Sequence, residues 1–132
     1  MLSSIGETAK RTSCNIETIR YYERIGLLPP PARTEGGHRM YDGAAVDRLR
    51  FIRRCRELGF PLPEIRTLLH LVDGGNYTCA EVKTLTLAQR DAVRAKIRDL
   101  ARMERVLDEM AERCAGGTVP DCAIIDTLFE RS

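Results

Sequence analysis

Residues 15–29, NIETIRYYERIGLLP, decide the fold of the N-terminal half of the chain. Asn15 has a side chain of the type that caps helices, and Gly26 can supply the left-handed backbone that ends them. The stretch therefore predicts a helix over about 16–25. The chain that follows, residues 27–31, ends in three prolines and must be extended.

The flanking sequence adds a shorter helix before this one and a hairpin after it. Ser4 and Glu7 form a capping box for a helix that is broken at Cys14, so the two helices meet at a tight turn. Two short helices joined in this way are typical of a helix-turn-helix. Residues 33–41 carry two glycines at their centre, which indicates two short strands around a glycine turn.

Two further helices follow the hairpin. Asp42 caps the first, in which apolar residues recur at every third position until Gly59 ends it. These apolar residues are Val46, Leu49, Ile52 and Cys55. The second helix is predicted over 61–71, with Pro63 tolerated in its first turn. Residues 73–78 contain two glycines and form the predicted linker.

One long helix dominates the second half of the chain. Residues 79–114 contain no proline and no glycine, and Val93, Leu100 and Leu107 recur every seven residues. This repeat is typical of a coiled coil, and the helix would be roughly 50 Å long. It could pack against the N-terminal helices, but these are too short to cover it, so we expect a partner helix in a dimer. Residues 115–132 follow as a glycine-containing loop and a short apolar helix.

The composition excludes several classes of protein. The 132 residues are 43% hydrophobic and 30% charged, as in ordinary globular chains, and no apolar run approaches the roughly 20 residues of a membrane span. The N-terminus lacks the apolar segment of an export signal, so we expect a cytoplasmic protein whose five cysteines are reduced. No motif of nucleotide-binding, hydrolytic or metalloprotease enzymes occurs, so we do not expect an enzyme.

The charges are unevenly divided along the chain. Residues 1–70 hold 12 basic and 8 acidic side chains, whereas residues 71–132 hold 9 and 11. The basic excess therefore lies entirely in the first half, as expected if that half meets the phosphates of a nucleic acid and the second half does not.

Residues 18–29, TIRYYERIGLLP, and residues 37–41, GHRMY, together resemble the winged helix-turn-helix of MerR-type transcriptional regulators. The resemblance covers nearly the whole chain. It implies that the second helix enters the major groove, that the hairpin is a wing on the DNA backbone, and that an antiparallel coiled coil joins two protomers. It also implies that the dimer distorts a promoter whose two elements are too far apart, and that effector binding changes the distortion so that bound RNA polymerase can start.

The predicted DNA contacts come from the second helix and the wing: Thr18, Arg20, Tyr21, Arg33, His38, Arg39 and Tyr41. Arg20 and Tyr21 offer a guanidinium and a phenol to bases or phosphates, whereas the wing residues meet phosphate and position the protein. Core packing is the alternative for Tyr22 and Tyr41, and a solvated surface is the alternative for Arg20 and Arg39. We interpret three further arginines as backbone contacts or surface charge: Arg53, Arg54 and Arg56.

Three cysteines match the metal-binding residues of the family's metal sensors: Cys79, Cys114 and Cys122. Cys79 and Cys114 lie at opposite ends of one helix, so they cannot share a metal ion within one chain. In an antiparallel dimer the Cys79 end of one helix lies beside the Cys114 end of the other, and Cys122 can fold back over the loop. Three sulfurs then converge, twice per dimer. For Cys14 and Cys55 we expect core filling.

Soft thiolates bind Hg(II), Cu(I), Cd(II), Pb(II) or Zn(II) rather than hard cations, and three sulfurs without a nearby histidine suit trigonal coordination. A cysteine at the head of the dimer helix is similar to sensors of divalent ions, because copper(I) sensors carry serine there. Residues 58–60 and 99–104 look most like mercury sensors, although the seven residues between Cys114 and Cys122 match copper(I) sensors. Hg(II) is the predicted effector, with Cd(II), Pb(II), Zn(II) and Cu(I) as alternatives.

The sequence thus predicts a mostly α fold: a winged helix-turn-helix domain over 1–72, a linker over 73–78, a dimerisation helix over 79–114, and a metal-binding loop with a C-terminal helix over 115–132. The predicted function is a metal-responsive regulator that binds double-stranded promoter DNA as a homodimer, with metal sites shared between protomers. Two rival interpretations stay open: a redox sensor that forms a disulfide between Cys114 and Cys122, and a coiled-coil interaction module.

Overall fold

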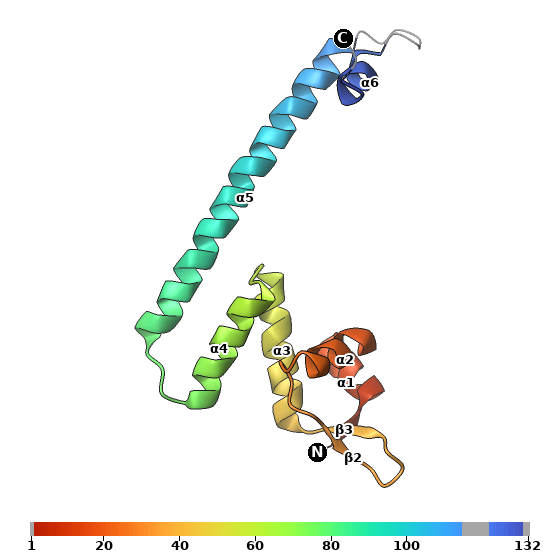
Figure 1. Cartoon of the computed structure of the whole chain (residues 1–132), viewed down its shortest axis with the longest axis vertical. Helices are drawn as coiled ribbons and strands as arrows, with labels where there is room; N and C mark the ends of the chain where they lie inside the picture. Colours follow the sequence, from red (N-terminus) through yellow and green to blue (C-terminus); the bar gives the residue numbers. More distant parts are fainter. Residues whose placement is uncertain (1, 115–121, 131–132) are drawn as a thin grey trace. The chain divides into compact units, whose positions relative to one another are not determined.

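The structure, a computed structural model, describes residues 2–114 and 122–130. Its contacts divide the chain into two units, residues 1–89 and residues 90–132. The elements of both units are drawn in Figure 1. Among the described residues, no helix is long and apolar enough to cross a membrane.

The two predicted helices at the N-terminus are confirmed as α1, Ile5–Thr12, and α2, Ile16–Arg24. The side chain of Ser4 accepts a hydrogen bond from the backbone N–H of Glu7, as the capping box requires. Asn15 caps α2 by accepting from the N–H of Glu17 at 2.7 Å. Gly26 takes the left-handed conformation, with φ of 80°, just after α2 ends.

The predicted hairpin is confirmed and belongs to a larger sheet. It consists of β2, Ala32–Arg33, and β3, Arg39–Tyr41. A third strand, β1, Ser3–Ser4, pairs antiparallel with the other edge of β3, so that the strand order is β1-β3-β2. The sequence did not predict β1, because a strand of two residues is too short to show alternation.

Helices α3, Gly43–Glu57, and α4, Leu62–Gly74, complete the packing of the first unit. The four apolar residues predicted to face inward from α3 are all buried. Helix α4 runs three residues further than the predicted end at residue 71, into the segment expected to be the linker. The core beneath these helices contains Ile19, Tyr22, Leu27, Leu28, Tyr41, Leu49, Ile52, Cys55, Phe60, Ile65 and Leu69.

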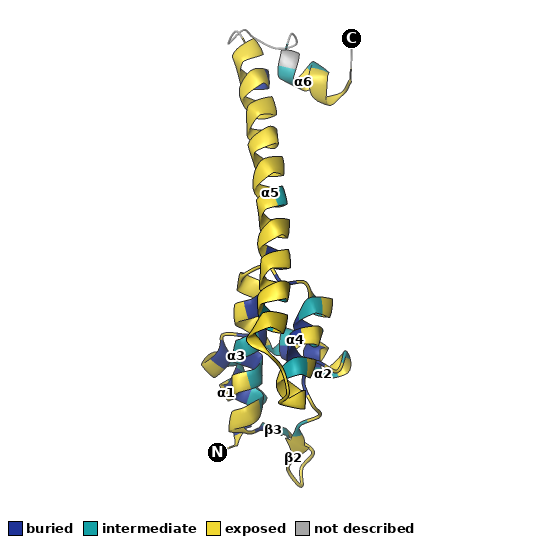
Figure 2. Cartoon of the chain, turned by 90° about the vertical axis from the view of Figure 1, so that its left-hand side faces the viewer, coloured by how far each residue is buried: buried dark blue, intermediate teal, exposed yellow. Residues whose placement is uncertain are grey.

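Helix α5, Cys79–Arg113, confirms the predicted long helix and spans 35 residues, about 50 Å at the α-helical rise. Its first eleven residues belong to the first unit, where Leu85 packs against the core and Gln89 is buried. Beyond Gln89 the helix is almost entirely exposed (Figure 2). Helix α6, Ala123–Leu128, lies beside the C-terminal end of α5 in Figures 1 and 2.

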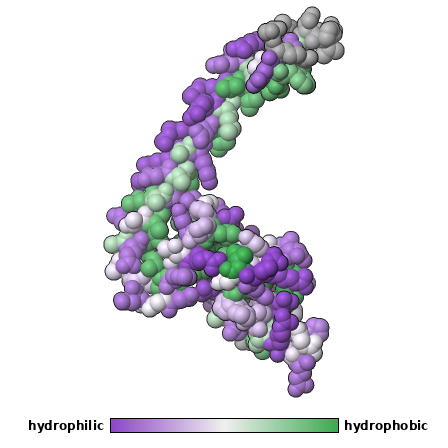
Figure 3. All heavy atoms as spheres, viewed as in Figure 1, coloured by the Kyte–Doolittle hydropathy of each residue, from purple (hydrophilic) through white to green (hydrophobic). Residues whose placement is uncertain are grey.

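The exposed part of α5 carries a run of large apolar side chains (Figure 3). Their exposed fractions lie between 36% and 63% for Val93, Ile97, Leu100, Met103, Val106 and Leu107. Monomeric proteins rarely leave a contiguous apolar surface of this kind in water. We call these six residues the α5 stripe.

Candidate nucleic-acid interface and metal-binding cysteines

The exposed face of α2 carries the residues predicted to enter the major groove. Arg20 is 46% exposed and pairs with Glu17 at 3.3 Å, an ion pair so solvated that it contributes little and leaves the guanidinium able to move. Tyr21 is 40% exposed, and the guanidinium of Arg24 lies 5.5 Å from the centre of its ring. Thr18, one turn before Tyr21, is half-buried.

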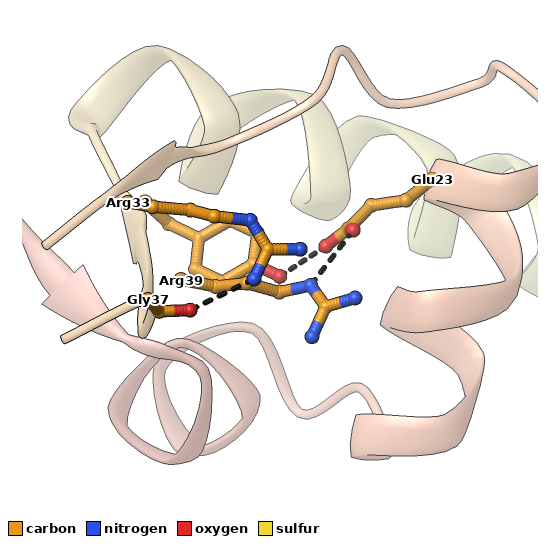
Figure 4. Close-up of polar contacts among 5 residues, drawn as sticks. Glu23, Arg33, Gly37 and Arg39 are labelled. Atoms are coloured by element: carbon orange, nitrogen blue, oxygen red, sulfur yellow. Dashed lines mark hydrogen bonds and ion pairs between the residues drawn. The ribbon is translucent and has the colours of Figure 1, made fainter.

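The wing between β2 and β3 presents an arginine and a histidine on a tight turn. Arg33 donates to the carbonyl of Gly37 at 2.8 Å, and this bond ties the two arms of the turn together (Figure 4). Gly37 has a φ of 83°, a conformation that few residues other than glycine adopt. His38 and Arg33 are both exposed, so the wing holds two groups that can meet phosphate.

Glu23 joins the wing to α2, the helix that is predicted to enter the major groove and that we call the recognition helix. Its carboxylate pairs with Arg39 at 3.1 Å and accepts a hydrogen bond from the hydroxyl of Tyr41 (Figure 4). The side chain of Glu23 is only 12% exposed, so these bonds are far less screened than a surface pair. Burial, together with the bond to Glu23, raises the pKa of Tyr41 well above its ordinary value of 10.0.

These contacts change the interpretation of Tyr41, which the sequence predicts to touch DNA. Its side chain is 1% exposed and its hydroxyl is used by Glu23, so it packs in the core, the alternative that the sequence left open. Tyr22 is likewise a core residue, 7% exposed. Sequence reasoning missed Glu23; the signal was a carboxylate set between Tyr22 and Arg24, near the end of α2.

Two arginines hold the chain that leaves α2. Arg66 of α4 donates to the carbonyl of Ile25 at 2.6 Å, and Arg48 of α3 donates to the carbonyl of Leu27 at 2.8 Å. Arg48 also makes a two-pronged ion pair with Asp73 near the end of α4. The C-terminal end of the recognition helix is therefore fixed by the two helices that pack behind it.

The three candidate metal ligands lie at helix ends. Cys79 is the first residue of α5 and is exposed, next to Thr78, whose hydroxyl accepts from the N–H of Glu81. Cys114 follows the last residue of α5 and is exposed, and Cys122 precedes α6 and is half-buried. All three are free thiols. The loop predicted over 115–121 lies outside the described residues.

No three metal-binding side chains meet within the described part of a single chain. Along α5, Cys79 and Cys114 are separated by about 50 Å, too far to share a metal ion within one chain. The donor set itself suits a soft ion, because all three side chains are thiols. Cys14 and Cys55 are buried in the core, as predicted, and burial raises the pKa of the Cys55 thiol.

Comparison with known proteins gives the family. The sequence profile described as "MerR HTH family regulatory protein" matches residues 3–72, and the profile "MerR, DNA binding" matches residues 46–110. The chain is 47% identical to the mercuric resistance operon regulatory protein of Bacillus cereus, covering 96% of this chain and 97% of that protein. It is 39% identical to the HTH-type transcriptional regulator ZntR of Escherichia coli strain K12, covering 94% and 90%.

Among solved structures, the transcription regulator PbrR691 from Ralstonia metallidurans CH34 in complex with lead(II) has a TM-score of 0.80 and 43% identity. The match covers 96% of this chain and 98% of that one. A profile match over more than half of the chain, and relatives aligned over nearly their whole lengths, agree with the geometry of the helix-turn-helix, the wing and α5. The chain belongs to the MerR family of helix-turn-helix transcriptional regulators, a family of non-enzymatic proteins, and within it to the metal-responsive branch.

Proposed function

We propose that the chain is a homodimeric activator that binds promoter DNA and starts transcription when Hg(II) bridges its two protomers. The observation that carries this proposal is the α5 stripe, an exposed apolar surface on a helix with a free thiol at each end. Each part of the proposal has its own support in the structure.

The stripe supports a dimer through α5. Burying a half-exposed aliphatic side chain contributes on the order of 1 kcal/mol, and each protomer offers six of them. Two copies of α5 packed antiparallel along the stripe would cover both surfaces. The same arrangement would bring Cys79 of one protomer to the end of α5 at which its partner carries Cys114 and Cys122.

The thiols support a soft metal ion as the effector. Two of them are exposed, the third is half-buried, and none is used in a disulfide, so all three sulfurs are available to a metal ion. Hg(II) accords with the name of the Bacillus cereus relative and with the segments 58–60 and 99–104. Bound Hg(II) would join the two protomers through three sulfurs. A ligand that bridges two chains can favour one arrangement of the dimer over another, which is what regulation requires.

The first unit supports DNA binding through α2 and the wing. Thr18, Arg20 and Tyr21 would face base edges and nearby phosphates, and Arg33 and His38 would meet the backbone. Arg39 would contribute charge while held by Glu23. Tyr41 would position the wing through Glu23 and would not touch DNA itself.

A competition titration tests the effector. Hg(II), Cd(II), Pb(II), Zn(II) and Cu(I) are added to the reduced protein, and thiolate-to-metal absorption is followed against a competing chelator. Hg(II) should bind tightest. If another ion bound more tightly, that ion would replace Hg(II) in the proposal. If the protein responded to an oxidant without metal and formed a disulfide between Cys114 and Cys122, redox sensing would replace metal sensing.

Transcription in vitro tests the regulation. With RNA polymerase and the promoter present, Hg(II) should raise the yield of transcript while the footprint of the protein on DNA stays nearly constant. Activation would then come from a change in the distortion of the promoter DNA while the protein stays bound to it. If the ion removed the protein from its site and merely relieved repression, the proposed activation mechanism would be wrong.

A further inference from the structure

A polar pocket of about 190 Å³ lies where the end of α1 meets α3. Four arginines and one carboxylate line it, together with the two residues that end α1: Arg11, Arg50, Arg53, Arg54 and Glu57, with Thr12 and Ser13. We call it the arginine pocket. Neither the recognition helix nor the wing contributes a side chain to it.

The arginine pocket has an unbalanced charge. Arg53 pairs with Glu57 at 3.3 Å, and among the described residues this is the one ion pair within the pocket. Arg11 donates to the hydroxyl of Ser3, a neutral partner, and Arg54 has no carboxylate partner in the described chain. Four positive groups therefore face one negative group, which leaves a net charge of +3 around a small polar cavity.

The helix end itself explains only part of this charge. The carbonyl end of a helix attracts cations, and Arg50 donates to the carbonyl of Arg11 at 3.2 Å in this way. That bond uses one guanidinium. The remaining guanidinium groups repel one another, and an anion from solution or from a partner would relieve this repulsion.

The position of the arginine pocket indicates which anion could compensate its charge. Thr12 and Ser13 come directly before Cys14 and the N-cap of α2, so the pocket lies at the N-terminal end of the recognition helix. The wing joins the other half of α2, through Glu23. Cationic groups are thus present at both ends of α2. A helix in a major groove has a phosphate strand on each side, and in helix-turn-helix proteins the first helix crosses the backbone.

We propose that the arginine pocket binds a phosphate of the DNA backbone, on the strand opposite to the one that the wing meets. Guanidinium groups match phosphate in geometry as well as in charge, because two parallel N–H groups can donate to two oxygens. The hydroxyl of Ser13, which is exposed, can add a further donor. The inference rests on the proposed DNA binding and adds to it a phosphate site outside α2 and the wing. For Arg53 and Arg54 it decides between the two interpretations that the sequence left open, in favour of backbone contact over surface charge.

The test removes the two arginines of the arginine pocket that, among the described residues, donate no hydrogen bond to α1. The double variant Arg53→Ala/Arg54→Ala is compared with a matched control, Arg98→Ala/Arg102→Ala, which removes two exposed arginines of α5 that are not part of the α5 stripe. The probes are a promoter fragment that the wild-type protein selects from random DNA and a duplex of unrelated sequence. Affinity for each is measured over a series of salt concentrations, after circular dichroism has verified folding.

The Arg53/Arg54 variant should lose affinity for both duplexes, and the slope of log affinity against log salt should fall by about 2, one released counterion for each protomer. The control should keep the wild-type slope. Unchanged affinity and slope in the Arg53/Arg54 variant would overturn the inference while wild-type binding still upheld the proposed function. Unchanged DNA binding with a loss of transcription would also overturn it, in favour of an acidic surface on RNA polymerase. If the wild-type protein selected no DNA, the proposed function itself would fail.

Discussion

A substitution at Gly59 tests how α5 is joined to the DNA-binding unit. Gly59 follows α3 with a φ of 83°, and a Cβ atom added there would lie 2.8 Å from the side-chain nitrogen of Gln89. That nitrogen donates to the carbonyl of Leu58 at 3.0 Å, and Gln89 is only 6% exposed. At Gly59, a backbone conformation that favours glycine therefore coincides with a close contact from Gln89 of α5.

The expected cost of Gly59→Ala has two parts. Left-handed backbone costs an alanine about 1–2 kcal/mol. The new methyl group also displaces Gln89, and loss of its hydrogen bond costs about 1 kcal/mol. We expect the free energy of unfolding to fall by about 2–3 kcal/mol, measured by urea denaturation at one fixed protein concentration.

A double-mutant cycle separates the two parts. In a Gln89→Ala background the new methyl group meets no side-chain amide, so Gly59→Ala should cost about 1 kcal/mol less than in the wild type. Gly75→Ala is the control, because Gly75 also has a positive φ, 65°, but nothing lies within 4 Å of its added Cβ. It should show no coupling to Gln89→Ala. Additive effects of Gly59→Ala and Gln89→Ala would refute the contact on which this reasoning depends.

Two further predictions concern the wing and the recognition helix. The pKa of Tyr41 is raised, mainly by burial and then by Glu23, so the native state holds the phenol proton more tightly than the unfolded chain does. The free energy of unfolding should therefore fall as pH rises above 10.0. Tyr41→Phe should weaken that fall, as measured by urea denaturation at pH values on either side of 10.0. An equal fall in the Tyr41→Phe variant would contradict this assignment. Arg20→Ala should reduce discrimination between promoter and unrelated DNA by about 1–3 kcal/mol for each half-site, and footprinting that shows wild-type protection would remove Arg20 from the interface.

The local signals in the sequence predicted most of the fold. Ser4, Asn15 and Asp42 each cap the helix that they were expected to cap, because a cap depends on residues only two or three positions away. Strand β1 and the contacts of Glu23 join segments that are distant in the sequence, and no local pattern encodes them. Tyr41 is a further example: the sequence offers core packing as one of its two possible roles, but it does not reveal that Glu23 accepts a hydrogen bond from its hydroxyl.

The candidate site was predictable to different degrees in its two parts. The exposed arginine of α2 and the basic residues of the wing follow from the motif. The sequence leaves Arg53 and Arg54 between backbone contact and surface charge, because the pocket that they form with the end of α1 is visible only in three dimensions. For the thiols, the length of α5 places Cys79 and Cys114 too far apart to act together in one chain. The third sulfur therefore has to come from the partner in a dimer. That Cys79 of one protomer completes the site of the other is the central claim of the proposed function.

Mixing two cysteine variants tests that claim most directly. A Cys79→Ser homodimer and a Cys114→Ser/Cys122→Ser homodimer should each lose high-affinity Hg(II) binding, because each change breaks both shared sites. In the heterodimer, the Cys79 of one chain faces the intact Cys114 and Cys122 of the other, and the second site has no cysteine. The separated heterodimer should therefore bind one Hg(II) ion with near-native affinity. A verified heterodimer without a tight site would contradict the shared site and the antiparallel dimer that builds it.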